Sequence, residues 1–139
     1  ENAQGITGHS MGGHGALTLA MANPGQYRSV SAFSPIANPT QSDWGKKQLT
    51  AYLGNADQPQ LDASLQMAAV GFDGPVLIDQ GSEDQFLDLL RPEALAHAMA
   101  ARRQDGQFRM QKGYDHSYFF VASFIEDHIA FHAEALYQD

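Results

Sequence analysis

The chain of 139 residues is 43% hydrophobic and 10% aromatic, which is enough apolar material for one small core. Its formal net charge of −8 argues against nucleic acid or an anionic membrane surface as a partner, because either would be repelled. Cysteine is absent, which excludes disulfides and thiolate metal sites, and no apolar run approaches the roughly 20 residues of a membrane span. We therefore expect a soluble, cytoplasmic protein with no membrane or nucleic-acid partner.

The first third of the chain predicts a strand, a helix and a second strand. Residues 5–8 have the character of the last part of a strand, and a helix rich in Gly, Ala, Leu and Met follows over residues 10–22. Asn23-Pro24-Gly25 ends that helix, because proline disfavours helical geometry in the residue before it. The alternating residues 29–33 then predict a strand, which Ser34-Pro35 closes.

The middle of the chain predicts a surface excursion, a helix and a third strand. Residues 36–60 contain Pro, Asn, Gly and a Trp, with one short helical patch near residues 47–53. This composition is typical of a surface segment that shapes a substrate pocket. A helix is possible over residues 61–70. Residues 75–79 form a short apolar strand that runs into the polar loop of residues 80–84.

The last third of the chain repeats the alternation of helix and strand. Residues 92–103 predict a helix with a proline in its first turn and two arginines near its end, as helix geometry and dipole prefer. Residues 108–111 are a brief strand, followed by the loop of residues 112–116 and a long helix from residue 117 to about 136. Strands that alternate with helices indicate an α/β fold with a parallel sheet and right-handed crossovers.

Residues 8–12, Gly-His-Ser-Met-Gly, fit the Gly-x-Ser-x-Gly nucleophile elbow, a strained strand-to-helix turn that exposes the serine hydroxyl at the carboxyl edge of a sheet. Its glycines leave room for the turn. We expect Gly13 and Gly15 for a similar reason, because a helix that starts this close to the sheet tolerates no bulky side chain on its inner face. The helix N-terminus directs backbone N–H groups at Ser10, so the N–H of Met11 is placed to stabilise an oxyanion. Two such donors are usually required.

Ser10 can attack a carbonyl efficiently only with an imidazole within hydrogen-bond reach, oriented in turn by a carboxylate. Of the six histidines, only His116 stands in a loop after a strand. We expect His9 to point away from the nucleophile as a packing and hydrogen-bonding residue, and His14 to be a wall residue of the helix that could line the site. The remaining three lie on helices with polar neighbours, where satisfied or solvated roles are expected: His97, His128 and His132.

Spacing alone does not choose the acid among four carboxylates at and after the third strand: Asp79, Glu83, Asp84 and Asp88. Asp84 stands deepest in the loop, whereas Asp79 belongs to the strand end. Asp115, beside His116 in sequence, fits an Asx-type turn better than an orienting role. The residues thus favour Asp84 without excluding its neighbours, and the order Ser, Asp, His is the one expected for an α/β-hydrolase fold.

Five segments together resemble the S-formylglutathione hydrolases, also called esterase D. They are Gly-His-Ser-Met-Gly-Gly-His-Gly-Ala at residues 8–16, Tyr-Arg-Ser-Val-Ser-Ala-Phe-Ser-Pro-Ile at 27–36, Trp-Gly-Lys-Lys at 44–47, Asp-Gln-Gly at 79–81 with Asp-Gln-Phe-Leu at 84–87, and Gly-Tyr-Asp-His-Ser-Tyr-Phe-Phe at 113–120. The resemblance covers essentially the whole chain and implies that Ser10, Asp84 and His116 are the nucleophile, acid and base. Ala37 departs from it, because members usually carry Cys there.

The resemblance implies hydrolysis of the thioester S-formylglutathione to formate and glutathione through a formyl-enzyme, the second step of glutathione-dependent formaldehyde detoxification, with no metal or organic cofactor. Glutathione is anionic and the chain is acidic, so local cations must attract it; Lys46 and Lys47 beside Trp44 are candidates. Two alternatives stay open. One is a general carboxylesterase, such as a feruloyl-esterase-like hydrolase, and the other is an inactive fragment of such an enzyme.

The chain starts Glu1-Asn2-Ala3-Gln4, without an initiator methionine, and enters the elbow within the first ten residues. We expect residues 1–139 to be the C-terminal portion of a single α/β-hydrolase domain, from the elbow to the final helix, without its N-terminal strands or the loop that supplies the second oxyanion donor. An open strand edge and an uncovered elbow helix invite association, with a homodimer as one outcome.

Overall fold

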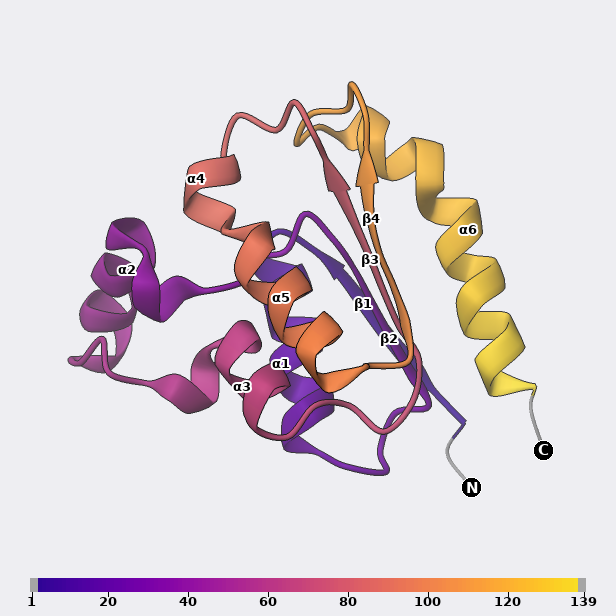
Figure 1. The fold of residues 1–139 in the computed structure, drawn as a ribbon, viewed down its shortest axis with the longest axis horizontal. Helices are drawn as coiled ribbons and strands as arrows, with labels where there is room; N and C mark the ends of the chain where they lie inside the picture. The colour runs from indigo at the N-terminus through magenta and orange to yellow at the C-terminus, as the bar shows by residue number, and fades with distance from the viewer. Residues whose placement is uncertain (1–2, 138–139) are drawn as a thin grey trace.

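Four parallel strands alternate with helices in the computed structural model, which describes residues 3–137 (Figure 1). The strands are hydrogen-bonded in chain order: β1 (Gly5–His9), β2 (Ser29–Phe33), β3 (Val76–Gly81) and β4 (Gly106–Gln111). In register, His9 pairs with Phe33 and Phe33 with Asp79. Because the strands all run the same way, their carboxyl ends and the loops that follow them meet at one edge of the sheet. The predicted parallel α/β sheet is confirmed.

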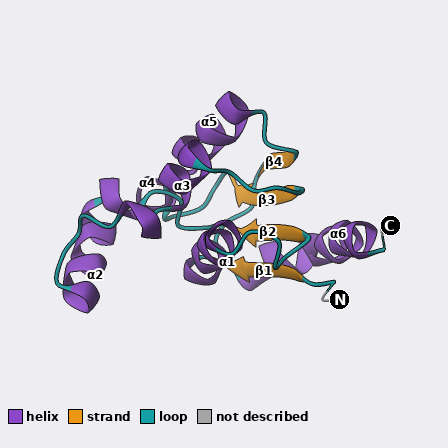
Figure 2. Ribbon diagram, turned by 90° about the horizontal axis from the view of Figure 1, so that it is seen from below, coloured by secondary structure: helices purple, strands orange, loops and turns teal. Residues whose placement is uncertain are grey.

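Helices cover both faces of the sheet (Figure 2). One face carries α1 (Met11–Ala22), α3 (Ala63–Ala69) and α5 (Pro92–Arg102), and the other carries α6 (Tyr118–Leu136). The excursion of residues 36–60 holds α2 (Asp43–Leu53), which stands away from the sheet beside the short α4 (Leu87–Leu90) (Figure 1). Two 3₁₀ turns, Pro39–Gln41 and Pro59–Leu61, flank α2. Within residues 3–137, no helix combines the length and apolar character needed to cross a membrane.

The apolar core lies between the sheet and the layer of α1, α3 and α5. Both central strands, β2 and β3, are buried along their whole length, as expected for parallel strands covered on both faces. Their alternate residues meet the apolar stripes of the three helices, and the fully buried members include Val30, Val76, Ile78, Leu17, Met67 and Leu95. Each such side chain contributes about 1.5–3 kcal/mol relative to exposure.

The sheet face toward α6 is polar and held by a buried carboxylate. Asp79 accepts hydrogen bonds from Arg109 Nε at 2.8 Å, Arg109 Nη2 at 2.6 Å and Gln111 Nε2 at 2.9 Å, both on β4. His128 of α6 contacts the same carboxylate through Nε2 at 2.7 Å and Ser31 Oγ through Nδ1 at 2.8 Å. This network therefore joins α6 to β2, β3 and β4.

His132, one turn further along α6, extends the network to the start of β2. Its Nδ1 lies 2.7 Å from Ser29 Oγ and its Nε2 lies 2.8 Å from Ser31 Oγ. Burial lowers the pKa of His132, and the charge of His128 lowers it further. Both histidines of α6 are thus satisfied by neighbours, as the sequence suggested, whereas His97 is exposed on α5.

β1 turns into α1 at Ser10, whose φ of 59° and ψ of −114° are rarely adopted by a residue with a side chain. Two glycines make the turn possible. A Cβ on Gly8 would collide with the backbone carbonyl of Gly12, and one on Gly13 would lie 3.1 Å from Pro35 Cβ. The expectations for Gly12 and Gly15 are wrong, because nothing lies within 4 Å of the place that either Cβ would take.

The glycines of the elbow can be tested as a pair. We expect Gly8→Ala to abolish the native turn, because the clash involves backbone atoms that cannot rotate away. Gly15→Ala should instead raise the free energy of unfolding by about 0.5–1 kcal/mol, since alanine is favoured in a helix interior. Urea unfolding followed by circular dichroism measures both. A Gly8→Ala protein as stable as Gly15→Ala would contradict this account of the turn.

The Asp79 network makes stability depend on pH. Burial raises the pKa of this carboxyl, but hydrogen bonds from His128, Arg109 and Gln111 and the charge of Arg109 outweigh it and lower the pKa from 3.8 to about 2. A pKa that falls on folding stabilises the folded state above the unfolded value, and the contribution, about 2 kcal/mol here, is lost as pH falls toward 2.

We expect Asp79→Asn to be destabilised at pH 7, and to lose less of its remaining stability than the parent protein between about pH 5 and pH 2. The exposed Asp73→Asn is the matched control and should follow the parent protein across this range. Urea unfolding at each pH measures the effect. Identical pH dependence in Asp79→Asn and the parent protein would show that the carboxylate does not carry it.

Candidate active site

Three strand ends supply the polar groups at the carboxyl edge of the sheet. Ser10 directly follows β1, Asp84 lies in the loop between β3 and α4, and His116 lies in the loop between β4 and α6. The parallel register brings these loops together although Ser10 and His116 are far apart in sequence. Ser10 is held at this edge by a hydrogen bond from its N–H to the Phe33 carbonyl, 2.9 Å long.

Ser10, His116 and Asp84 form a continuous hydrogen-bonded chain. His116 Nε2 lies 3.0 Å from Ser10 Oγ, and His116 Nδ1 lies 2.6 Å from Asp84 Oδ2. A neutral imidazole satisfies both contacts when Nδ1–H donates to the carboxylate and Nε2 accepts from the serine hydroxyl. The Asp84 side chain is fully buried, so water competes little for the bond to His116. The arrangement can therefore take a proton from Ser10 and stabilise the resulting imidazolium.

The structure separates Asp84 from the carboxylates that the sequence left open. Asp79 points to the opposite face of the sheet, toward Arg109 and His128. Glu83 and Asp88 are exposed. Asp115 accepts a hydrogen bond from the backbone N–H of Ser117 at 2.9 Å, which is the Asx-type turn predicted for it.

Asp84 is held by two donors besides His116. Its Oδ1 accepts the backbone N–H of Phe86 at 2.7 Å, and its Oδ2 accepts Gln80 Nε2 at 3.0 Å. Gln80 lies in the Asp-Gln-Gly segment of residues 79–81 but had no role predicted from the sequence. The alternation of side chains along a strand was the available signal, since it puts Asp79 and Gln80 on opposite faces and sends only one of them toward Asp84.

The side chain of His9 lies against the ring of His116, so the expectation that it points away from the site is wrong. The two ring centroids are 4.8 Å apart with the planes tilted by 37°, and Phe86 meets the same ring edge-on at 5.1 Å. Burial lowers the pKa of His9, and the charge of His116 lowers it further while that of Asp84 opposes this. Its Nε2 is buried without a hydrogen-bond partner among residues 3–137. His9 is therefore a packing residue that stays neutral beside His116.

A small apolar cavity of about 190 Å³ lies beside the elbow, between α1 and α2. Its lining residues are Met11, His14, Ile36, Pro39, Trp44, Gly45, Gln48, Leu49, Tyr52 and Leu53. His14 is thus the wall residue expected, fixed where its Nε2 accepts the backbone N–H of Ala63 at 3.2 Å. Burial lowers the pKa of His14, although Asp62 opposes this. Met11 opens α1, so its N–H belongs to the first-turn donors that lack a partner within the helix.

The three residues predicted to bind substrate do not share one surface. Trp44 lines the cavity beside Met11. Lys46 and Lys47 are exposed and line no part of it, and Lys46 instead borders a separate hollow with Asp57. A helix places neighbouring positions on different faces, which is why adjacency in sequence did not place the lysines in the cavity.

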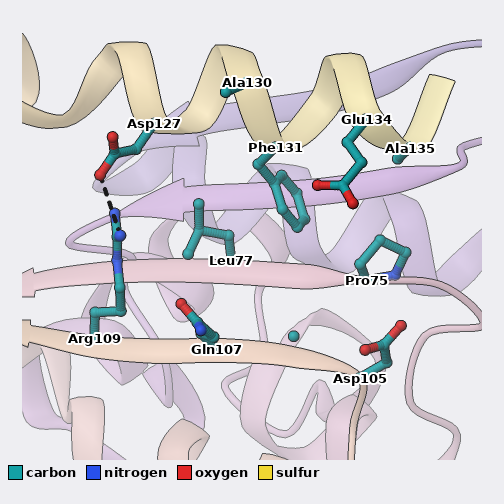
Figure 3. Close-up of a pocket in the computed structure, with 11 residues that line it drawn as sticks. Pro75, Leu77, Asp105, Gln107, Arg109, Asp127, Ala130, Phe131, Glu134 and Ala135 are labelled. Atoms are coloured by element: carbon teal, nitrogen blue, oxygen red, sulfur yellow. Dashed lines mark ion pairs between the residues drawn. The ribbon is translucent and has the colours of Figure 1, made fainter. Parts of the chain in front are cut away.

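A larger hollow, about 600 Å³, lies between α6 and the edge strand β4, and Figure 3 shows its lining. Arg109 pairs there with Asp127 at 3.1 Å, and Gln107, Phe131 and Glu134 lie along the same groove. None of Ser10, Asp84 and His116 lines it. Within residues 3–137, no cluster of three or more histidine, aspartate or glutamate side chains is placed to hold a metal ion.

The structure of an S-formylglutathione hydrolase from Agrobacterium tumefaciens matches this chain with a TM-score of 0.88 at 43% identity, over 96% of this chain and 50% of that one. Dipeptidyl peptidase 4 of Porphyromonas gingivalis matches 94% of this chain and 19% of its own with a TM-score of 0.75 at 18% identity, a likeness of fold alone. Such neighbours confirm the predicted α/β-hydrolase fold.

A curated S-formylglutathione hydrolase from Paracoccus denitrificans (strain Pd 1222) is 68% identical over 136 residues, which are 96% of this chain and 49% of the relative. The chain thus spans about half the length of the relatives it matches. A family model described as "Putative esterase" matches residues 1–131. Because that match covers nearly the whole chain, the chain belongs to this esterase family.

Proposed function

We propose that the protein carrying this chain hydrolyses the thioester S-formylglutathione to formate and glutathione, with a Ser-His-Asp triad formed by Ser10, His116 and Asp84. The observation that carries the proposal is the hydrogen-bonded chain from Ser10 Oγ through His116 to Asp84, with links of 3.0 Å and 2.6 Å, at a strained strand-to-helix turn. Identities of 68% and 43% to two S-formylglutathione hydrolases support the substrate.

The reaction begins when Ser10 Oγ attacks the thioester carbonyl and its proton passes to His116 Nε2. Asp84 stabilises the imidazolium, and the N–H of Met11 donates to the oxyanion of the tetrahedral intermediate. When the C–S bond breaks, His116 returns the proton to the glutathione sulfur and a formyl ester remains on Ser10. Water then attacks the ester with His116 as base, which releases formate and restores the hydroxyl.

His9 favours this cycle by remaining uncharged. A cation 4.8 Å from the His116 ring would oppose the imidazolium that forms in each half-reaction. Burial and the charge of His116 both lower the pKa of His9, which disfavours a charge on that ring. The neutral ring of His9 then only packs against the ring of His116.

We also propose that Trp44 contacts the substrate from the cavity beside Met11, and that Lys46 and Lys47 attract the carboxylates of glutathione. The position of Trp44 supports the first part. The exposed lysines do not line this cavity, so their proposed effect is the long-range attraction of an anion to cations on an acidic chain.

A general carboxylesterase is the second candidate, because the cavity beside the elbow is lined mainly by apolar side chains. Those residues include Ile36, Leu49 and Tyr52, which suit the alkyl or aryl group of an ester. The same triad would serve either substrate.

The proposal extends to the whole protein. We propose that residues 1–139 are the C-terminal portion of one domain, that the remainder supplies the second oxyanion donor, and that the enzyme acts in the cytoplasm on glutathione thioesters from formaldehyde. A homodimer is also proposed, and analytical ultracentrifugation tests it: a monomer at all concentrations would contradict it.

The substrate assignment is tested by comparing S-formylglutathione with an aryl acetate, using the protein at its full natural length and its Ser10→Ala variant. We expect S-formylglutathione to have the higher kcat/KM. The variant should lose activity on both substrates by at least about 10³-fold, because it lacks the nucleophile. A higher kcat/KM for the aryl acetate would favour the carboxylesterase, and full activity in Ser10→Ala would refute the proposed nucleophile.

The binding residues are tested by their effects on KM. Lys46→Ala combined with Lys47→Ala should raise KM for S-formylglutathione and leave KM for a neutral aryl acetate unchanged, with a difference that shrinks at high salt because charges in solvent are screened. Trp44→Ala should raise KM for both substrates. Equal KM values for S-formylglutathione in the double variant and the parent protein would remove the lysines from the proposal.

A further inference from the structure

Gln80 is a buried amide at the end of β3 that touches Asp84. It is 0% exposed, and its Nε2 donates to Asp84 Oδ2 at 3.0 Å and to the Gly81 carbonyl at 3.1 Å. The same Oδ2 accepts the Nδ1–H of His116 at 2.6 Å. One carboxylate oxygen therefore accepts hydrogen bonds from both the Gln80 amide and the imidazole of His116, the base of the proposed triad.

The two supports of Asp84 differ in what holds them. The Phe86 N–H belongs to the same loop as Asp84, two residues on, so it moves with the loop. Gln80 belongs to β3, and its neighbour Asp79 is fixed on the other face by Arg109 and His128. Gln80 is thus the contact that ties the Asp84 carboxylate to the rigid sheet.

This placement costs stability. Gln80 Oε1 is buried and has no hydrogen-bond partner among residues 3–137. A buried carbonyl oxygen without a partner is unfavourable, and an apolar side chain of similar size would avoid the cost. Residues that lower stability without an evident packing gain are typical of functional sites.

We propose that Gln80 is a positioning residue for the hydrolysis: its amide fixes the Asp84 carboxylate so that Oδ2 faces His116 Nδ1. The inference rests on the triad of the proposed function but not on the identity of the substrate. Without the amide, only the loop bond to Phe86 and the bond to the His116 ring itself hold the carboxylate, so carboxylate and ring can tilt together away from Ser10.

The test compares Gln80→Leu and Gln80→Met with Gln107→Leu, in the protein at its full natural length. Gln107 is an exposed glutamine on β4, away from the site, and provides the matched control (Figure 3). We expect both Gln80 variants to lose about tenfold in kcat with KM unchanged, the effect of one charge-assisted hydrogen bond. Their melting temperature should change little, because the cost of the unpartnered oxygen and the gain from the bonds of the amide are removed together. Gln107→Leu should keep the parent kcat.

A proton NMR signal reports the geometry directly. We expect the Nδ1–H of His116, in its 2.6 Å bond to Asp84, to resonate far downfield. This signal should shift upfield or broaden in the Gln80 variants and stay in place in Gln107→Leu. An unchanged kcat in both Gln80 variants would overturn the proposal. A second result would also overturn it: activity falls only in proportion to the loss of folded protein, and the folded fraction keeps the parent's downfield signal. Gln80 would then have only a structural role.

Both kcat values are measured with S-formylglutathione and with an aryl acetate, and the rate of covalent labelling by a fluorophosphonate is measured beside them. If the parent protein cleaves only the aryl acetate, the proposed substrate is refuted. The effect of the Gln80 variants on kcat is then measured with the aryl acetate. If the parent protein cleaves neither but is labelled at Ser10, slower labelling of the Gln80 variants supports the positioning role and equal rates overturn it. A parent protein that is not labelled refutes the triad and the positioning role together.

Discussion

Three backbone hydrogen bonds hold Ser10 in a conformation that its side chain disfavours, and the geometry of the site follows from them. Its N–H donates to the Phe33 carbonyl at 2.9 Å, and its carbonyl accepts the N–H groups of His14 at 3.0 Å and Ile36 at 3.2 Å. Strain of this kind costs of order 1–3 kcal/mol and persists only where the surroundings fix it. Here the surroundings are β2, the loop after it and the first turn of α1, and together they aim the hydroxyl at His116.

The two faces of β3 carry two different hydrogen-bond networks. Asp79 points to the α6 side and joins three strands and a helix, while Gln80 and the following loop serve Asp84. The α6 side even repeats the residue types of the proposed triad, because Asp79, His128 and Ser31 are hydrogen-bonded in series. Ser31 is 0% exposed, so no substrate reaches its hydroxyl. Exposure at the strand ends, and not the residue types alone, separates a catalytic arrangement from a structural one.

Local signals were enough for most of the fold. Periodicity and turn residues predicted all four strands and the four longer helices on the sheet, because these elements follow alternation, helical spacing and the breaks at glycine and proline. They predicted only the second half of α2, and they missed the single turn of α4, which is too short to show a period. The resemblance to a family singled out Asp84, whereas spacing left its neighbours open. The structure then placed Asp79 on the opposite face of β3 and showed Glu83 and Asp88 to be exposed.

Contacts between distant segments explain what the sequence could not give. His9 was expected to point away because its neighbour in the turn is the nucleophile, but its direction depends on where the loop after β4 brings His116. Gly15 was grouped with Gly13 by sequence, although only Gly13 faces Ala32 and Pro35. Lys46 and Lys47 lie on the same helix as Trp44 but on other faces of it. Which face lines the cavity depends on how α2 packs against the elbow.

Peptide mapping after reaction with a fluorophosphonate tests the central claim, that Ser10 is the activated hydroxyl, most directly. Residues 1–28 contain one serine, Ser10. The next tryptic peptide, residues 29–46, contains four buried serines: Ser29, Ser31, Ser34 and Ser42. The account predicts a single phosphonyl adduct in the peptide that ends at Arg28, lost in Ser10→Ala. An adduct in the peptide of residues 29–46, or labelling that survives in Ser10→Ala, would contradict it.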